Sequence, residues 1–206
     1  MIRNIRFFKK ENTLPPRIRI TQDQIINTSI GIVREKGMES LNARAIAEMI
    51  GCSVHPIFRV YKSMDGLKEE VYQETEKIYN AAMYEAMGDP DNGFLNIGLA
   101  YIEFAKREKN LFKLLFMSDA FKSKSMLEIV GSTEGDDEVL EMISRITGLG
   151  KQFSQELYAG VWLTAHGIAS MYATNNCRFS DDEIKRLLNN SFKGLMMKLK
   201  SEEGEK

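Results

Sequence analysis

Apolar residues between positions 41 and 62 recur at a helical spacing in two short runs. The first run places four of them at i, i+3, i+4 and i+7, the stripe of a short helix: Ala43, Ile46, Ala47 and Ile50. Gly51 follows, and a glycine can take the left-handed conformation that closes a helix. Ile57 and Tyr61 form a second inward face at i and i+4. The pattern predicts two short helices joined by a tight turn at residues 51–53.

Polar residues at the ends of these runs predict how each helix begins. Asn42 is a good cap for the first helix, and Ser53 is expected to cap the second. Pro56 lies in the first turn of the second helix, where its missing N–H has no intrahelical partner to lose. Val54, His55 and Arg59 are then left on the outward face.

The rest of the chain also reads as helix, with no strand-like alternation. Thr21 and Ser180 open capping boxes, and Ser63 is a further cap. In the helix after Ser63 we expect Leu67, Val71, Ile78 and Ala82 to face inward. Two short helices with loops are expected in 118–150, where glycines are frequent. The expected longer helices are 21–37, 63–87, 92–108, 152–174 and one that opens at Ser180 and includes Leu199, and a short apolar piece is expected at 111–117.

Composition and charge favour a folded chain with a basic beginning. The 206 residues are 43% apolar, enough for a core. Residues 1–66 contain 11 basic and 6 acidic side chains, and residues 67–206 contain 17 and 23. Residues 1–20 are expected to be a basic arm, either a solvated tail or a contact to phosphates.

The sequence has no signal peptide and no apolar stretch long enough to span a membrane. We therefore expect a cytoplasmic protein with no membrane partner.

The outward face of the second short helix is the part of such a helix pair that can enter the major groove of DNA. Short helix pairs with a glycine turn are also common in all-α proteins without that role. Arg44, on the first helix, either reaches a phosphate or is a solvated surface residue.

The two cysteines, Cys52 and Cys177, are expected to be free thiols, and no metal site or cofactor is expected. No catalytic set or phosphate-binding glycine loop is present, so we do not expect an enzyme.

The run AIAEMIGCSVHPIFRVYKSMDGL resembles the tetracycline-repressor (TetR) family of regulators over about residues 20–67. YIEFAKREKNLFKLLF at 101–116 and the run from Trp162 to Gly167 are similar to stretches in the body of that family. The resemblance implies an all-α fold with an N-terminal three-helix helix-turn-helix DNA-binding domain, followed by a helical ligand-binding and dimerisation domain. The implied divisions are a basic arm, 1–20, the DNA-binding domain, 21–66, and the effector-binding and dimerisation domain, 67–206.

The resemblance and the outward face together give a set of candidate DNA-binding residues. Phe58 is a departure, because the family usually has there a tyrosine whose hydroxyl holds a phosphate, whereas Arg59 and Lys62 can still supply charge. Val can touch a thymine methyl group, and His can donate or accept a hydrogen bond at a base edge. The candidates are Asn42, Arg44, Ser53, Val54, His55, Pro56, Phe58, Arg59 and Lys62.

Two further sets are expected in the body. Aromatic residues at helical spacing form either plain core or the lining of an effector cavity: Tyr101, Phe104, Phe112, Phe116 and Trp162. The last two helices have apolar faces wider than one partner within the chain needs, which predicts a homodimer. His166 is expected to be a buried, hydrogen-bonded histidine at that interface rather than a metal or effector ligand. The candidate dimer residues are Val161, Ala165, His166, Ile168, Leu188, Phe192 and Leu195.

These features lead to one functional hypothesis and one alternative. The first is a repressor that binds a palindromic operator in double-stranded DNA as a homodimer and is released by a small apolar effector. The alternative is a dimeric small-molecule-binding protein of the same fold that does not bind an operator.

Overall fold

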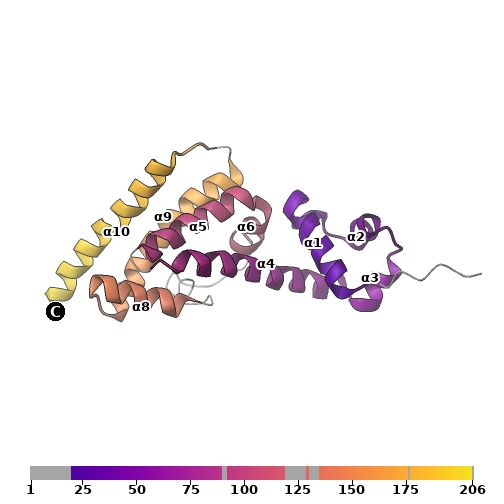
Figure 1. Cartoon of the computed structure of the whole chain (residues 1–206), viewed down its shortest axis with the longest axis horizontal. Helices are drawn as coiled ribbons and strands as arrows, with labels where there is room; N and C mark the ends of the chain where they lie inside the picture. Colours follow the sequence, from indigo (N-terminus) through magenta and orange to yellow (C-terminus); the bar gives the residue numbers. More distant parts are fainter. Residues whose placement is uncertain (1–19, 90–91, 119–128, 130–134, 176, 206) are drawn as a thin grey trace, which may run out of the picture.

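The computed structural model describes residues 20–89, 92–118, 129, 135–175 and 177–205, and every regular element among them is helical. The expected all-α fold class is therefore confirmed. The expected basic arm falls at residues 1–19, outside the described residues, as does much of the glycine-rich segment that follows Ser118. Figure 1 shows an elongated molecule with a small head, residues 20–63, at one end of a larger body, residues 64–205.

The head consists of three α-helices and a short 3-10 helix. They are α1 (Gln22–Lys36), η1 (Met38–Ser40), α2 (Ala43–Ile50) and α3 (His55–Val60). The expected capping box is present, because Thr21 Oγ1 accepts from the Gln24 N–H at 3.2 Å and the Gln24 side chain accepts in return from the Thr21 N–H. The helices meet around four fully buried residues, Ile25, Val33, Ile46 and Ile57. Burial of this kind stabilises three short helices that would not persist alone.

Helix α4 (Met64–Met87) runs from the head into the body (Figure 1). Ser63 caps it by accepting from the Gly66 N–H at 3.3 Å, as expected. Leu67 and Val71 are fully buried, but the expectation for Ile78 is wrong, since that side chain is 36% exposed. The body helices α5 and α6 pack instead on the side of α4 that carries Tyr79. The expected boundary between residues 66 and 67 falls in the first turn of α4, so one continuous helix joins the two parts.

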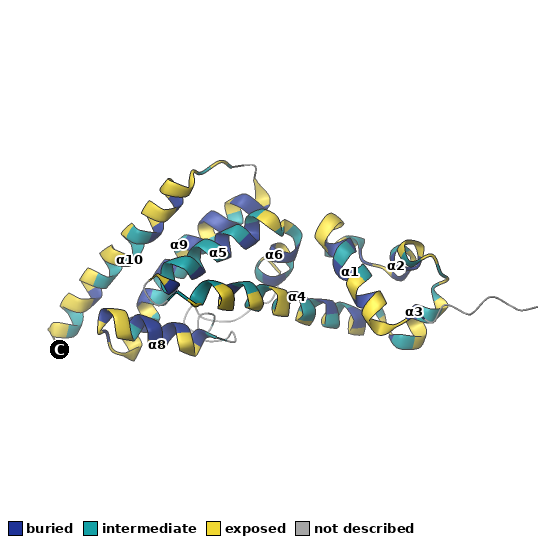
Figure 2. Ribbon diagram, in the orientation of Figure 1, coloured by how far each residue is buried: buried dark blue, intermediate teal, exposed yellow. Residues whose placement is uncertain are grey.

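Among the described residues the body has five helices besides α4, and two of them, α5 and α6, pack directly on α4. The five are α5 (Gly93–Arg107), α6 (Lys109–Phe116), α8 (Asp136–Thr147), α9 (Lys151–Thr174) and α10 (Asp181–Gly204). Helix α9 lies against α5, α6, α8 and α10, so it is the centre of the body. Figure 2 shows the buried residues where these helices face one another and exposed residues along the outside of α10. The Ser180 capping box is confirmed, and Leu187 of α10 is 42% exposed.

Candidate DNA-binding surface and effector cavity

The outer face of α3 is open, and its inner face is fixed in the core of the head. His55 and Arg59 are exposed and lie one turn apart. On the opposite side Ile57 is fully buried and Tyr61 is 8% exposed. Phe58 also points outward, with 46% of its surface exposed. A rigid helix with a polar and aromatic outer face can therefore be offered to a partner at this end of the molecule.

The turn between α2 and α3 follows the expected geometry at its first residue only. Gly51 takes the left-handed conformation, with φ 77° and ψ 37°, and its N–H donates to Ala47 O at 3.0 Å. The expectation that Ser53 caps α3 is wrong, because α3 begins at His55 and Val54 is its cap residue, without a side-chain hydrogen bond. The Val54 carbonyl accepts from the N–H groups of Ile57 and Phe58, which starts the helix one residue later than expected.

The remaining candidates of the head differ in how far they are free to reach a partner. Asn42 uses its amide within the chain: Oδ1 accepts from the N–H groups of Arg44 and Ala45, and Nδ2 donates to Ser40 O. Val54 and Pro56 are half-buried, and Val54 packs against the core. Asn42 is nevertheless exposed, and the other exposed candidates are Arg44, Ser53, His55, Phe58, Arg59 and Lys62.

The basic excess of the N-terminal part does not come from the helix pair. Residues 21–66 contain five basic and five acidic side chains, so the excess lies entirely in residues 1–20. One of the five basic groups, Arg34, already pairs with Glu108 of the body at 2.8 Å. Any attraction of the α2–α3 surface for phosphates therefore depends on the positions of Arg44, Arg59 and Lys62 and on the residues before α1.

The head is attached to the body through α1 as well as through α4. Helix α1 packs on α6, and the Arg34–Glu108 ion pair lies at the junction of α5 and α6. Asn110 Nδ2 donates to Arg34 O at 3.0 Å, and Gln22 Nε2 donates to the Glu70 carboxylate at 2.8 Å. A displacement of α6 or α4 therefore acts directly on the position of α1.

The five aromatic residues expected to form a core or a cavity lie together in the body. Tyr101 is the centre: its ring lies 5.5 Å from Phe112, 5.2 Å from Phe116 and 6.2 Å from Trp162 between centroids. Tyr79 of α4 joins them with edge-on contacts to Tyr101 and Phe104, at 6.0 and 5.5 Å. We call these residues, together with His166, the aromatic cluster.

His166 belongs to this cluster and is hydrogen-bonded within the chain, as expected, while its place at a dimer interface stays a prediction. Its Nδ1 is 2.8 Å from the Tyr101 hydroxyl, and its ring stacks on Trp162 with centroids 4.7 Å apart. Burial lowers the pKa of its imidazole below the ordinary value, which favours the neutral form. The helical spacing identified His166 as inward-facing, but it did not specify which neighbouring helix the side chain meets.

Three adjoining cavities lie beside the aromatic cluster. The first, about 140 Å³, is bordered by α5, α8, α9 and α10 and includes Phe94, Gly98, Val161 and Leu188 in its walls. A second, of about 30 Å³, shares Phe94, Gly98 and Val161 with the first and adds Tyr101 and Trp162. A third of similar size shares Tyr79, Ile97 and Tyr158 with the second and is closed by Asp136.

Sequence reasoning did not select three of these residues: Tyr79, Asp136 and Tyr158. Tyr79 follows Val71 and Thr75 at helical spacing along α4, so the apolar stripe carries a usable signal for it. Asp136 resembles its acidic neighbours in sequence, and only its 5% exposure sets it apart. Among the described residues no group of three His, Cys, Asp or Glu side chains is placed to hold a metal ion.

The expected dimer residues require correction. Val161, Ala165, Ile168 and Leu188 are buried inside the chain, since α9 packs on α5 and α10, so their side chains are not available to a second copy. Phe192 and Leu195 are half-buried against the same core. For Phe192 and Leu195 a place at a dimer interface stays a prediction.

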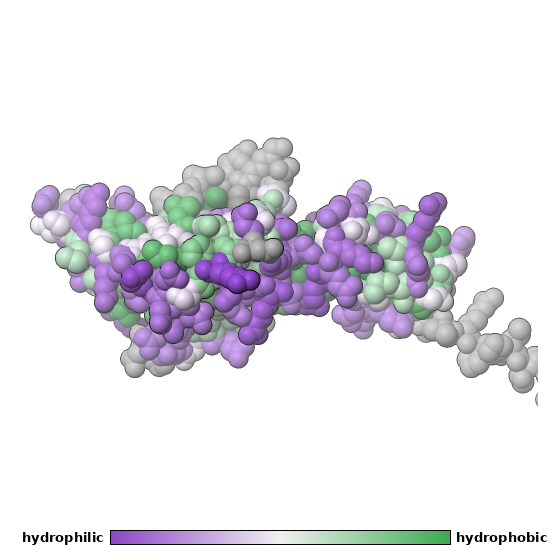
Figure 3. Space-filling model, turned by 90° about the horizontal axis from the view of Figure 1, so that it is seen from above, coloured by the Kyte–Doolittle hydropathy of each residue, from purple (hydrophilic) through white to green (hydrophobic). Residues whose placement is uncertain are grey.

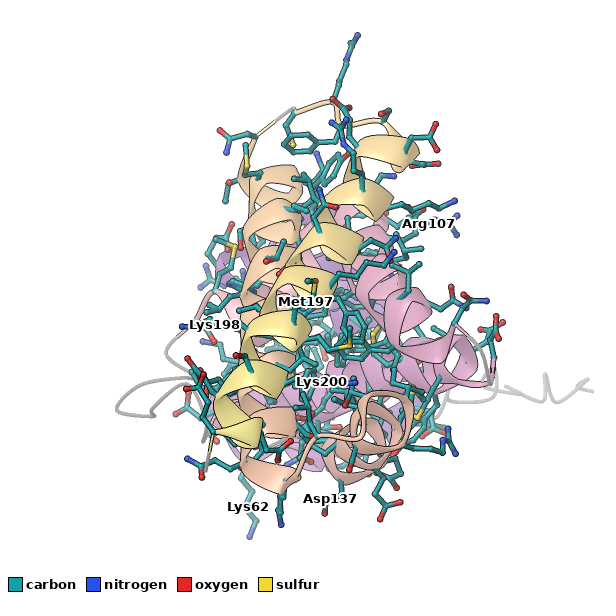
Figure 4. The ribbon with its side chains drawn as sticks, turned by 90° about the vertical axis from the view of Figure 1, so that its left-hand side faces the viewer. Lys62, Arg107, Asp137, Met197, Lys198 and Lys200 are labelled. Atoms are coloured by element: carbon teal, nitrogen blue, oxygen red, sulfur yellow. The ribbon has the colours of Figure 1, made fainter. Side chains whose placement is uncertain are left out.

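A different set of apolar residues lies on the outer side of α9 and α10. Their exposed fractions are 48% for Leu163, 44% for Met171, 42% for Leu187 and 70% for Met197. Figure 4 looks onto α10 and shows Met197 on its outer surface, with Lys198 and Lys200 nearby. In Figure 3 apolar residues gather on the body, while the narrow part between body and head is hydrophilic. We call Leu163, Met171, Leu187 and Met197 the outer apolar face.

The described residues contain no helix long and apolar enough to cross a membrane. No protein-family model matches the chain. The chain is similar to an uncharacterized HTH-type transcriptional regulator, YvkB, of Bacillus subtilis (strain 168), with 25% identity over 103 residues. That match covers 50% of this chain and 54% of the relative, so it spans about half the length of each protein.

Proposed function

We propose that the chain is a TetR-type, ligand-responsive, DNA-binding transcriptional regulator that acts as a repressor. The observation that carries the proposal is the α2–α3 pair, in which His55 and Arg59 are exposed while Ile57 and Tyr61 anchor the opposite side of α3. This is the geometry that a helix-turn-helix presents to the major groove. The similarity to a helix-turn-helix regulator of Bacillus subtilis supports the same class.

The proposed regulator binds a palindromic operator as a homodimer. Two heads reach successive major grooves when their recognition helices stand about 34–36 Å apart. The outer apolar face supports pairing through α9 and α10, because Leu163 and Met197 expose large apolar side chains without a partner helix over them. Gly167 and Gly194 lie on the same two helices with open space beside them, which allows a second helix to approach closely.

The proposed effector site is the aromatic cluster with its adjoining cavities. A molecule bound there touches α4 through Tyr79, whose ring in turn contacts Phe116 of α6. Both α4 and α6 pack against α1. The Arg34–Glu108 ion pair adds a second link between α1 and the start of α6. Effector binding would therefore shift the heads, provided that the effector binds more tightly to the spacing that does not fit DNA. Residues 21–66 and 67–206 are the proposed DNA-binding and effector-binding parts.

The salt dependence of duplex binding tests the DNA-binding proposal. Duplexes selected by the protein from a random pool are titrated by fluorescence anisotropy at several salt concentrations. A DNA-binding regulator loses affinity steeply with salt, with a slope of about 0.9 for each phosphate neutralised. Arg59→Ala should reduce that slope by about one and weaken binding at least about tenfold.

Arg107→Ala is the matched control, because Arg107 is an exposed arginine of the body (Figure 4) and its loss changes the net charge equally. It should leave duplex affinity unchanged. Weak binding at every salt concentration would contradict the proposal and support the alternative, a dimeric small-molecule-binding protein without an operator.

A further inference from the structure

The first cavity beside the aromatic cluster has the size of one small ring. It is about 140 Å³ and lies between α5, α8, α9 and α10. An apolar cavity of about 150 Å³ holds one benzene molecule, whereas pockets for drug-sized molecules are about 300–1,000 Å³. The two adjoining cavities, about 30 Å³ each, are too small for a ring. An effector in this region must therefore lie mainly in the first cavity.

Helix α5 leaves this space open because two of the residues that it places in the wall are glycines. They are Gly93 and Gly98. A Cβ at Gly98 would lie 3.3 Å from Leu188 Cδ1, and a Cβ at Gly93 would lie 3.0 Å from Met142 Cε. Leu188 and Met142 belong to the opposite walls of the same cavity. A side chain at either glycine would therefore reduce the space between α5 and its neighbours.

The described wall of this cavity is apolar and carries no charge. Phe94 and Phe192 contact each other in it, with ring centroids 5.3 Å apart, and Val161 and Leu188 add aliphatic surface. Among the described residues no Asp, Glu, Lys, Arg or His side chain lines the cavity. An ion that entered would lose its hydration without gaining an opposite charge, which is strongly unfavourable. The wall therefore selects uncharged molecules.

Two asparagine amides supply the polar side chains of the wall, Asn92 and Asn189. Asn189 is half-buried, and its Nδ2 donates to Lys185 O at 3.0 Å. Asn92 is exposed, and its Nδ2 lies 3.4 Å from Asp89 Oδ2. No group of the described chain donates to the Oδ1 atom of either asparagine. Each amide therefore offers a bound molecule a hydrogen-bond acceptor, and the half-buried one belongs to Asn189.

We propose that the effector is an uncharged molecule of about one aromatic ring that carries a hydroxyl or N–H group, as a phenol does. Its ring lies in the first cavity between Phe94 and Leu188, and its donor binds Asn189 Oδ1. This inference rests on the proposed function, since it names the chemical class that the regulator senses.

The position of the proposed ligand connects two parts of the regulator. Leu188 lines the cavity, and its neighbour Leu187 belongs to the outer apolar face. The ring thus contacts the inner side of the helices whose outer sides form the proposed dimer contact. Phe94 also lines the second cavity, together with Tyr79 of α4. A displacement of Phe94 by the ring therefore acts on the aromatic cluster and on the helix that continues into the head.

Four probes with the same methyl-substituted ring test the inference with the full-length chain. The probe p-cresol is uncharged and carries a donor, toluene lacks the donor, and 4-methylbenzoate and 4-methylbenzylammonium are charged. Isothermal titration calorimetry gives the affinities. We expect p-cresol to bind about 3–10-fold more tightly than toluene, because it gains one hydrogen bond, with no detectable binding of either ion. Absence of p-cresol binding, or binding of toluene or an ion as tightly as p-cresol, would overturn the proposal.

Methionine methyl groups report where the molecule binds. Met142 lines the cavity and is 8% exposed, whereas Met171 lies on the outer apolar face. In methyl NMR spectra p-cresol should shift the signal of Met142 and leave that of Met171 unchanged. A shift confined to methionines outside the cavity would contradict binding at this site.

Two pairs of substitutions test the wall itself. Asn189→Leu removes the acceptor and should lower the affinity for p-cresol to that for toluene, whereas Asn190→Leu, at the adjacent exposed position, should change neither affinity. Gly98→Leu places a side chain in the cavity and should abolish binding of both molecules. Gly31→Leu in α1, where a Cβ would meet nothing within 4 Å, should preserve both affinities. Unchanged p-cresol binding in either Asn189→Leu or Gly98→Leu would refute the assigned site.

The comparison of probes needs no variant, so the proposal can be refuted even if Gly98→Leu does not fold. Duplex affinity measured in the same samples separates the two proposals. Selective binding of p-cresol without duplex binding would contradict the regulatory function alone. Salt-dependent duplex binding without binding of p-cresol would contradict the effector class alone.

Discussion

Gly51 allows a direct measurement of what the turn between α2 and α3 requires. Its φ of 77° lies in the left-handed region, and a Cβ at this position would meet nothing within 4 Å. Gly51→Ala therefore adds backbone strain without a packing clash. The left-handed conformation costs an alanine about 1–2 kcal/mol, and the reduced freedom of the unfolded chain returns about 0.4–1 kcal/mol. We expect the free energy of unfolding to fall by about 1 kcal/mol.

Gly31→Ala is the matched control. Gly31 lies within α1, and a Cβ there would also meet nothing within 4 Å, but its backbone is helical. Alanine should raise the free energy of unfolding at this position by about 0.5–1 kcal/mol. Urea unfolding followed by circular dichroism gives both values, and their difference reports the cost of the positive φ, since the unfolded-state effect is common to both. Equal stabilities of the two variants would refute the reasoning.

Two further perturbations test the outer apolar face and the buried histidine. Leu163→Glu or Met197→Glu should convert the proposed dimer to a monomer in light scattering. Met49→Glu changes an exposed methionine of the head and should leave the proposed dimer intact. A monomeric wild type would contradict the proposed face. For His166 the folded pKa lies below its ordinary value of 6.5, so the unfolded chain binds protons more tightly and stability should fall as the pH drops below about 6.5. In urea unfolding between pH 7.5 and 5.5, His166→Gln should flatten this dependence, and an unchanged dependence would exclude His166 as its source.

Helix ends could be predicted from the sequence because they depend on local hydrogen bonds. Thr21, Asn42, Ser63 and Ser180 all cap the expected helices. In each case the cap accepts from an N–H only two or three residues away, so the residues that determine the bond are adjacent in the sequence. Ser53 does not cap α3, because the helix begins at His55 and Val54 stands at the cap position without a side-chain hydrogen bond.

Inward-facing residues were also predictable, but their partners were not. Tyr101 and Phe112 were selected together, and they do contact each other. Leu188 was expected to meet a second chain, yet it packs inside this one. Helical spacing defines the buried side of a helix, whereas the crossing of α9 with α5 and α10 defines which side chains meet there.

The sequence by itself determined that the chain is helical, where most helices begin and end, and that α3 has one apolar side and one polar side. Only the tertiary structure decided that Asp136 lies with Tyr79 and Tyr158 beside the aromatic cluster, and which apolar residues of α9 and α10 stay exposed. The physical reason is the range of the interactions. Caps and amphipathic spacing act within one or two turns, whereas a cavity and an exposed face depend on how helices far apart in the chain pack together.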